Sequence, residues 1–277
     1  MMKTLLLANL KGGVGKSAIA TQIAYYFHDV LKQRVLFIDM DHQGNSSKAI
    51  KASGLATVSQ NTSYALLTKD IEIEKESFLL LAADPNLSML ERQPKDHNDY
   101  ANRLAERIKS LENDFDVCVI DVNPNPDIRL TVSLVSADYV LSPIQLNQEA
   151  VDGIGAMLND PKRGIRSVQA NWNKGLQFLG LLPNLVEPTP FQRQNLVDLA
   201  KAYAKFMFII GGKPANIPRR TAVAEAQAEG KPIWRLSSIG SDGKERPRTS
   251  ARDAWKEIKP VFDEIARRME IAPVKGN

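Results

Sequence analysis

The sequence has very few cysteines and histidines, and these shortages exclude several kinds of site. Among its 277 residues there is one cysteine, Cys118, which excludes an intrachain disulfide and an iron–sulfur cluster with several cysteine ligands. Cys118 lies inside an apolar run typical of a buried strand, where a lone thiol packs as a small hydrophobic group. The three histidines, at positions 28, 42 and 97, show no spacing typical of metal ligands.

Long apolar runs, repeats and linkers are also missing. No run is long enough to cross a bilayer, and the N-terminus lacks the pattern of a signal peptide. No internal repeat, low-complexity tract or Pro/Gly/Ser-rich linker divides the chain. We therefore expect residues 1–277 to form a single domain of a soluble, cytoplasmic protein.

Short apolar runs alternate with longer helical stretches along the whole chain. This alternation predicts an α/β fold in which a mostly parallel, twisted sheet is covered by helices on both faces. The expected strands are Thr4–Ala8, Val35–Ile38, Phe78–Leu81, Val117–Ile120, Tyr139–Ser142, Phe178–Leu182 and Met207–Ile210. The expected helices include Ser17–Leu31, Asn98–Leu111, Glu149–Leu158, Phe191–Ala204, Arg219–Glu229 and Ala254–Met269.

The most informative motif is the glycine-rich run that follows the first expected strand and opens the first expected helix. It reads Lys11-Gly12-Gly13-Val14-Gly15-Lys16-Ser17, and Ala18 follows it. Backbone N–H groups of such a loop cradle a polyphosphate at the helix N-terminus. Lys16 would pair with the β- and γ-phosphates and Ser17 would bind Mg²⁺, so the motif predicts a P-loop NTPase fold and the cofactors ATP and Mg²⁺.

Lys11 departs from the usual P-loop pattern, which has a glycine where Leu10 stands. This second lysine comes too early in the loop to reach its own γ-phosphate easily. We therefore expect Lys11 to serve a nucleotide bound by a neighbouring subunit. The alternative interpretation of the whole run is a glycine-rich turn with two solvated lysines.

Acidic residues close two of the apolar strands. Asp39 and Asp41 follow the strand at 35–38, and Asp121 follows the strand at 117–120. Ligands collect at the carboxyl ends of strands in an open parallel sheet. Asp121 is the expected partner of a metal-bound water. Asp41, or with less support Asp39, is the candidate for positioning the attacking water, and Asp39 is otherwise a residue of the nucleotide site.

Together these segments resemble the ParA/MinD family of deviant Walker ATPases, and the ParA partition branch most. The resemblance covers nearly the whole chain in order, including the segments Asp39–Asn45, Ser136–Pro143 and Ile217–Arg220. It implies slow, Mg²⁺-dependent ATP hydrolysis by a sandwich homodimer that forms on ATP binding, with Lys11 acting across the interface. Because the sequence begins close to its first expected strand, we expect no helix-turn-helix domain ahead of that strand.

The resemblance also implies partners and further site residues. A ParB-like centromere-binding protein would stimulate hydrolysis, and the nucleoid-associated dimer would position a plasmid or chromosome. Asn184 matches the adenine-reading asparagine, although a plain turn amide is the alternative, and Pro218 and Arg219 match the loop that flanks the base. Departures from the family are His42 in place of proline, Ala18 in place of threonine, and the segment 122–126 in the second switch.

Positive charge gathers near the C-terminus. The net charge is +4 and the isoelectric point is near 9.0, which favours a polyanionic partner. The stretch Ser237–Ser250 predicts a mobile basic loop followed by a helix at 254–269. The resemblance implies non-specific binding of double-stranded DNA there, and the candidate contacts are Lys244, Arg246, Arg248 and Arg252. Solvated charge without a partner is the alternative for any one of them.

Two rival functions use the same fold. A MinD-like membrane ATPase needs an amphipathic C-terminal helix, and Trp255, Ile258, Phe262, Ile265 and Met269 do recur at helical spacing. Such a stripe more often packs on a core, and Pro273 interrupts a terminal anchor, so we expect no membrane partner. A metabolic enzyme that phosphorylates or amidates a carboxylate needs a polar substrate pocket that the sequence does not reveal. A positioner of another cellular cargo remains a further alternative.

Overall fold

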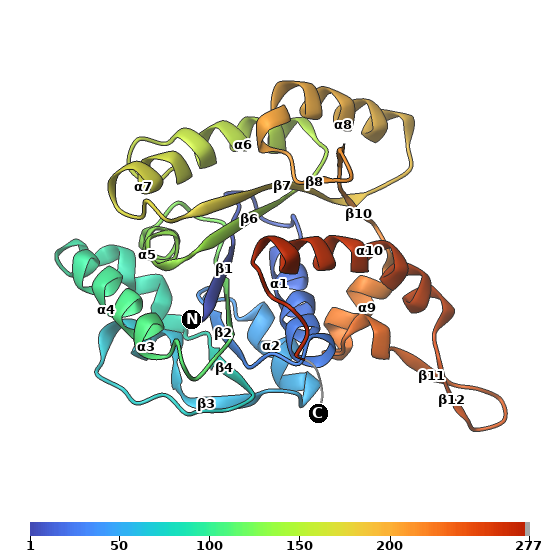
Figure 1. Cartoon of the computed structure of the whole chain (residues 1–277), viewed down its shortest axis with the longest axis horizontal. Helices are drawn as coiled ribbons and strands as arrows, with labels where there is room; N and C mark the ends of the chain where they lie inside the picture. The colour runs from blue at the N-terminus through green and yellow to red at the C-terminus, as the bar shows by residue number, and fades with distance from the viewer. Residues whose placement is uncertain (275–277) are drawn as a thin grey trace.

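An eight-stranded sheet forms the centre of the computed structural model, which describes residues 1–274 apart from the side chains of residues 148–152 (Figure 1). The strand order is β10-β7-β6-β1-β5-β2-β4-β3, and every neighbouring pair is parallel. The strands are β1 Lys3–Leu7, β2 Val35–Asp39, β3 Thr57–Thr62, β4 Phe78–Ala82, β5 Val117–Asp121, β6 Tyr139–Ile144, β7 Gln177–Val186 and β10 Ile217–Pro218. The predicted parallel α/β sheet is confirmed.

The central strands are short apolar runs that are buried on both faces, as expected for strands covered by helices on each side. In β2 and β5 every residue is buried, including the acid that ends each strand. Their register pairs Asp39 with Asp121, and Leu7 of β1 pairs with the same Asp121. The topology therefore brings the P-loop and both acids together at the carboxyl ends of the central strands.

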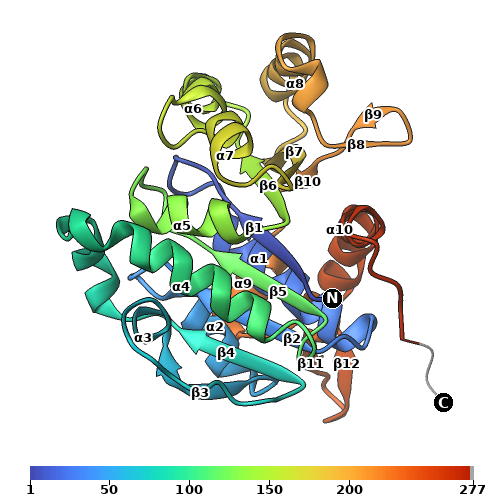
Figure 2. The ribbon, with the colours of Figure 1, turned by 60° about the vertical axis from the view of Figure 1, so that its left-hand side comes forward.

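Helices cover both faces of the sheet, as predicted (Figure 2). On one face pack α3 Ser63–Thr68, α4 His97–Ser110, α5 Ile128–Ser136, α6 Gln148–Asn159, α7 Ile165–Asn171 and α8 Pro190–Ala202. On the other face pack α1 Lys16–Tyr25, α2 Asn45–Ser53, α9 Thr221–Glu229 and α10 Thr249–Arg268. Short stretches of other helix types are the π-helix η1 Tyr26–Val30 and the 3-10 helices η2 Pro85–Arg92, η3 Pro94–Asp96, η4 Ala204–Phe206 and η5 Ile233–Arg235.

The apolar stripe of α10 lies in the core. Ile258, Phe262, Ile265 and Met269 are all buried in the hydrophobic cluster that includes α1 and α9, and Trp255 packs against its edge. This burial explains the helical spacing of the stripe without a membrane. Within residues 1–274, no helix combines the length and the hydrophobicity needed to span a bilayer.

The expected strand at Met207–Ile210 is only partly correct. Met207 makes an isolated parallel bridge to Leu181 of β7, and β8 (Ile209–Ile210) pairs instead with β9 (Lys213–Pro214) in a small antiparallel hairpin. Gly211 and Gly212 have φ angles of 55° and 79°, which let the chain reverse directly after Ile210. The edge of the main sheet is therefore β10, and the opposite edge is β3, a polar strand that the sequence analysis did not identify.

The basic segment near residue 240 also differs from the prediction. Where the sequence predicted a loop over 237–250, β11 (Ser237–Ile239) and β12 (Glu245–Pro247) form an antiparallel hairpin. Gly243, with a φ angle of 74°, lies in its turn. The next helix, α10, begins at Thr249 rather than at Ala254. Figure 1 shows this hairpin extending away from the body of the protein.

Candidate functional site

The glycine-rich loop joins β1 to α1 and directs the helix N-terminus toward an open cleft. Gly13 and Gly15 have φ angles of 76° and 84°, a conformation that disfavours residues with a side chain. A Cβ atom at Gly15 would lie 2.3 Å from the Asn184 side-chain nitrogen, so only glycine fits there. No side chain caps the N-terminus of α1. Its first N–H groups are therefore available to an anion.

Lys16 is a buried cation at the first position of α1. Its side chain is only 6% exposed, and its Nζ donates to the Lys11 carbonyl oxygen at 3.1 Å. Burial lowers the pKa of Lys16, while the charges of Asp121 and Asp41 oppose that shift. A poorly hydrated ammonium group that is fixed in the loop interacts strongly with an incoming phosphate.

Asp121 has one oxygen in use and one without a partner. Its Oδ2 accepts a hydrogen bond from the Ser46 hydroxyl at 2.5 Å, and its buried Oδ1 has no hydrogen-bond partner. Burial raises the pKa of Asp121, and the hydrogen bond from Ser46 acts against that rise. An unpartnered, buried carboxylate oxygen beside the Ser17 hydroxyl fits the outer coordination sphere of a hard cation such as Mg²⁺.

Asp39 and Asp41 differ in how their oxygens are used. Asp39 Oδ2 accepts from both the backbone N–H and the hydroxyl of Ser47, at 2.8 and 2.6 Å, and its Oδ1 accepts from the Asp41 N–H at 3.1 Å. Burial, and then the charge of Asp121, raise the pKa of Asp39. Asp39 thus organises the loop after β2, whereas Asp41 lines the cleft, which favours Asp41 as the residue that positions water.

The cleft brings together half of the predicted nucleotide-site residues, while Lys11, Val14, Asp39, Asp121, Asn184, Pro218 and Arg219 do not line it. It has a volume of about 580 Å³, within the range of small-molecule sites. It is lined by Gly12, Gly13, Gly15, Lys16, Ser17, Ala18, Asp41, His42, Gln43, Asn45, Pro124, Asn125 and Gln227. Its walls are therefore the P-loop, the loop after β2 and the loop after β5.

Lys11 is oriented by the loop that follows β6. Its Nζ donates to Asn147 Oδ1 at 3.2 Å, and its backbone N–H donates to Asn9 Oδ1 at 2.7 Å. Gln145 Nε2 donates to the Gly13 carbonyl oxygen at 3.0 Å. The ammonium group of Lys11 thus lies toward the segment 145–147, and its predicted role across a dimer interface stays a prediction.

The residues predicted to hold adenine lie at the end of β7 and at β10. Asn184 is buried, and its Nδ2 donates to the Val14 carbonyl oxygen of the P-loop at 2.7 Å. Pro218 belongs to the edge strand β10, and Arg219 forms an ion pair with Glu187 at 3.2 Å. Here the Asn184 amide uses one N–H on the P-loop backbone. The adenine role of these residues stays a prediction.

The four candidate DNA contacts are not equivalent. Arg248 is only 27% exposed and forms ion pairs with Glu225 at 3.0 Å and Glu229 at 2.7 Å. Arg246 is 64% exposed and pairs with Asp242 at 2.6 Å. Arg252 lies 3.8 Å from Asp253, and Lys244 has no acidic partner within 4.0 Å among residues 1–274. Arg248 therefore fastens the hairpin to α9, while the other three face solvent.

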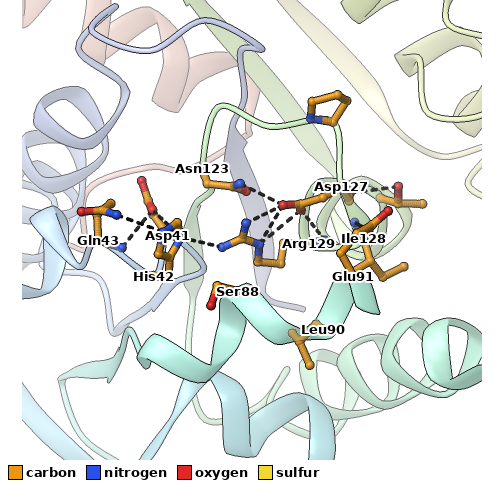
Figure 3. A network of polar contacts seen from close by, with 12 residues as sticks. Asp41, His42, Gln43, Ser88, Leu90, Glu91, Asn123, Asp127, Ile128 and Arg129 are labelled. Atoms are coloured by element: carbon orange, nitrogen blue, oxygen red, sulfur yellow. Dashed lines mark hydrogen bonds and ion pairs between the residues drawn. The ribbon is translucent and has the colours of Figure 1, made fainter. Parts of the chain in front are cut away.

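A buried arginine that the sequence analysis missed lies beside the cleft. Arg129, in the first turn of α5, contacts His42 and Asp127, and Figure 3 shows these side chains between the loops after β2 and β5. The local signal was the pair Asp127 and Arg129 at the start of a helix, directly after the atypical segment 122–126. Spacing alone does not reveal the contact with His42, because 87 positions separate the two residues.

A parallel sheet with a glycine-rich loop at a helix N-terminus, a buried lysine and a strand-end aspartate with one unpartnered oxygen defines a P-loop ATPase domain. A family model described as an AAA domain matches residues 2–178. IncC of Escherichia coli is 34% identical over 98% of this chain and 71% of its own length. The chain therefore belongs to the ParA/MinD family of deviant Walker ATPases, which the sequence motifs had indicated.

Other similar proteins agree with this assignment. The chromosome partitioning protein ParA of Myxococcus xanthus is 26% identical over 93% of this chain and 89% of its own. Cobyrinic acid a,c-diamide synthase of Mycobacterium smegmatis, solved with ADP and magnesium, has a TM-score of 0.67 and 27% identity over 83% of this chain and 91% of that one. An ATP complex of a McdA variant from Cyanothece shares the fold, with a TM-score of 0.75 and 19% identity over 99% of both chains.

Proposed function

We propose that this protein is a Mg²⁺-dependent partition ATPase whose ATP-bound homodimer binds DNA without sequence preference. The observation that carries the proposal is the cleft lined by Lys16, Ser17 and Asp41, together with the buried, unpartnered oxygen of Asp121, whose charge acts on Lys16. The partition role is supported by the relatives IncC and ParA, and the ATP and Mg²⁺ requirement by the magnesium-bound synthase of the same fold.

Each residue of the proposed nucleotide site has a separate role in hydrolysis. Lys16 and the N–H groups from Gly12 to Ala18 bind the phosphates, and Asn184, Pro218 and Arg219 hold the base. Ser17 would bind Mg²⁺ and Asp121 would hold it through a water, and the metal would supply positive charge that neutralises the phosphates. Asp41 orients the attacking water, and Asp39 holds the loop that carries Asp41.

Dimerisation places Lys11 at the nucleotide of the partner subunit. A cation supplied across the interface stabilises charge that develops on the transferring phosphoryl group. Hydrolysis then removes the interaction between Lys11 and the partner's nucleotide, which holds the two subunits together. Turnover is slow, because the cycle serves to time the release of DNA and not to convert ATP at a high rate.

The DNA-binding surface comprises the β11–β12 hairpin and the first turn of α10. Its contacts are Lys244, Arg246 and Arg252, whose exposed charges reach phosphates and release counterions. Each subunit offers few such residues, so binding depends on two surfaces acting on one duplex. A ParB-like centromere-binding protein stimulates hydrolysis and so releases the nucleoid-associated dimer.

An electrophoretic mobility-shift series tests this proposal. Parent protein is titrated onto two duplexes of unrelated sequence with ATP, with ADP or without nucleotide, at about 50 to 200 mM salt. We expect ATP-dependent binding to both duplexes, with affinity falling steeply over this range. The Lys16→Ala variant is the matched control that loses the ATP response. Binding that ignores nucleotide, or ATP-dependent capture by anionic liposomes instead of DNA, would reject the proposal, the second result in favour of a MinD-like protein.

A further inference from the structure

Arg129 links the two loops that form the wall of the cleft near Asp41. It lies in the first turn of α5, its side chain is only 5% exposed, and its Nη1 lies 3.0 Å from Nδ1 of His42. The same Nδ1 lies 3.5 Å from Asp41 Oδ1. A set of close contacts thus runs from Arg129 on α5 to His42, whose ring lies against the Asp41 carboxylate proposed to position water (Figure 3).

The other end of the contact set is fixed by Asp127. Its carboxylate caps α5 by accepting from the Arg129 N–H at 3.0 Å, and it accepts from Arg129 Nε at 3.1 and 3.2 Å and also from Nη2. Asn123, in the loop after β5, donates to the same carboxylate at 3.0 Å. The guanidinium group is therefore held against the loop after β5 and leaves Nη1 directed at the loop after β2.

The guanidinium group needs a hydrogen-bond acceptor at His42. Arginine stays charged and has only donors, so a buried Nη1–H needs an acceptor. A histidine Nδ1 can accept only in the neutral imidazole with its proton on Nε2. Gln43 contacts both neighbours: its side-chain amide lies 2.9 Å from His42 Nε2 and must present its oxygen to Nε2–H in this tautomer, and its backbone N–H donates to Asp41 Oδ1 at 3.0 Å. His42 and Asp41 are thus positioned as one unit.

We propose that Arg129 is a positioning residue for ATP hydrolysis, which acts through His42 on Asp41 and joins the loops 41–45 and 122–127 into one element. This inference rests on the proposed function of the cleft. A carboxylate that orients water must be held to within about half an ångström by its neighbours. Arg129 supplies that restraint from α5, and any movement of the loop after β5 is transmitted to Asp41 through the same interactions.

Two substitutions of His42 test the inference at a position whose side chain is partly exposed. His42→Ala removes the acceptor, and His42→Asn replaces Nδ1 with an amide oxygen at a similar place. We expect His42→Ala to lower kcat for ATP hydrolysis about tenfold, as for other supporting residues, with ATP affinity within about twofold of the parent. His42→Asn retains at least about half of the parent kcat. Equal loss in both variants, or loss confined to KM, would overturn the inference.

A double-variant comparison then asks whether Arg129 acts through His42. We expect Arg129→Gln to lower kcat about tenfold and the variant with both Arg129→Gln and His42→Ala to be no slower than His42→Ala alone, because removing one interaction twice has no second effect. Losses that multiply to about a hundredfold would show that Arg129 acts independently of His42 and would overturn the inference. If Arg129→Gln does not fold, the two His42 variants decide the question.

The same measurements separate this inference from the proposed function. If Asp41→Ala hydrolyses ATP at the parent rate, the cleft mechanism itself is wrong. If Asp41→Ala is inactive while His42→Ala is as fast as the parent, the cleft mechanism stands and the role of Arg129 fails.

Discussion

The nucleotide cleft and the β11–β12 hairpin both concentrate charge, but they hold it in opposite ways. In the cleft, Lys16 is 6% exposed and Asp121 keeps a buried oxygen without a partner. On the hairpin, Arg246 is 64% exposed and already paired with Asp242. Charges in the cleft are fixed and poorly hydrated before a ligand arrives, whereas those of the hairpin are solvated and exchangeable.

This difference determines how much each residue contributes. A buried, pre-positioned charge interacts with a ligand through a low effective dielectric, so single residues of the cleft should be indispensable. An exposed cation adds little by itself and is screened by salt, so the hairpin should act through the sum of its charges. Single substitutions should therefore have large effects in the cleft and small ones on the hairpin.

The largest expected effect follows from Lys16→Ala. It removes the buried cation that pairs with the phosphates, and we expect Mg²⁺·ATP affinity to fall at least ~100-fold, or about 3 kcal/mol. Isothermal titration calorimetry measures the change, with Lys244→Ala as a matched loss of one exposed lysine that leaves affinity unaltered. Parent-like affinity in Lys16→Ala would show that the glycine-rich loop is not a phosphate site.

Asp41→Ala and Lys11→Ala should separate hydrolysis from assembly. Because Asp41 acts on the water, its loss should leave ATP binding and dimerisation intact while hydrolysis falls roughly 100-fold or more. Lys11→Ala should weaken both, since Lys11 is proposed to act across the interface. Light scattering after size exclusion, together with phosphate release, distinguishes the two patterns. Normal turnover in Asp41→Ala would transfer the role to Asp39 or to backbone groups.

The hairpin should show a smaller and cumulative effect. Reversal of Lys244, Arg246 and Arg252 to glutamate should weaken binding to all duplexes alike and reduce the salt slope by roughly one for each phosphate that is no longer neutralised. Reversal of the exposed lysines Lys174, Lys201 and Lys205, near α7 and α8, matches the charge change and should leave DNA affinity nearly unaltered. An equal weakening by both triple variants would mean that only net charge matters.

Arg248 provides the internal contrast on the same hairpin. Because it is ion-paired with Glu225 and Glu229, Arg248→Ala should lower the melting temperature by more than Arg246→Ala does. Thermal denaturation followed by circular dichroism tests this order. The reverse order would remove the distinction between a structural and a DNA-facing arginine.

The smallest expected effect is a change in stability with pH. Burial raises the pKa of Asp121 to about 6, so the folded state binds this proton more tightly than the unfolded state. The protonated carboxyl of Asp121 therefore stabilises the folded state at pH values below the ordinary pKa of an aspartate. This stabilisation is lost as the pH rises through about 6. Without nucleotide, Asp121→Asn should thus melt a few degrees above the parent at about pH 7.5, with a smaller difference at about pH 4.5. A constant difference between these pH values would contradict the assigned burial.

Local sequence patterns predicted the fold and the nucleotide cleft more fully than the contact between His42 and Arg129 or the hairpin at 237–247. Residues 11–17 follow an apolar strand directly, and Asp39 and Asp121 end strands, so a parallel sheet brings them together without further information. The contact between His42 and Arg129 depends on the relative placement of two loops, which local spacing does not encode. The hairpin at 237–247 has weak strand propensity, and its base is fixed by the distant Glu225 and Glu229 rather than by its own residues.

We propose that ATP hydrolysis in the nucleotide cleft controls how long the β11–β12 surface stays on DNA. The most direct test is the lifetime of the protein on an immobilised duplex after loading with ATP and removal of unbound nucleotide. We expect the parent to leave at the rate at which it hydrolyses ATP, while Asp41→Ala stays bound many times longer. Equal lifetimes for the two proteins, with Asp41→Ala inactive in hydrolysis, would show that hydrolysis does not control release.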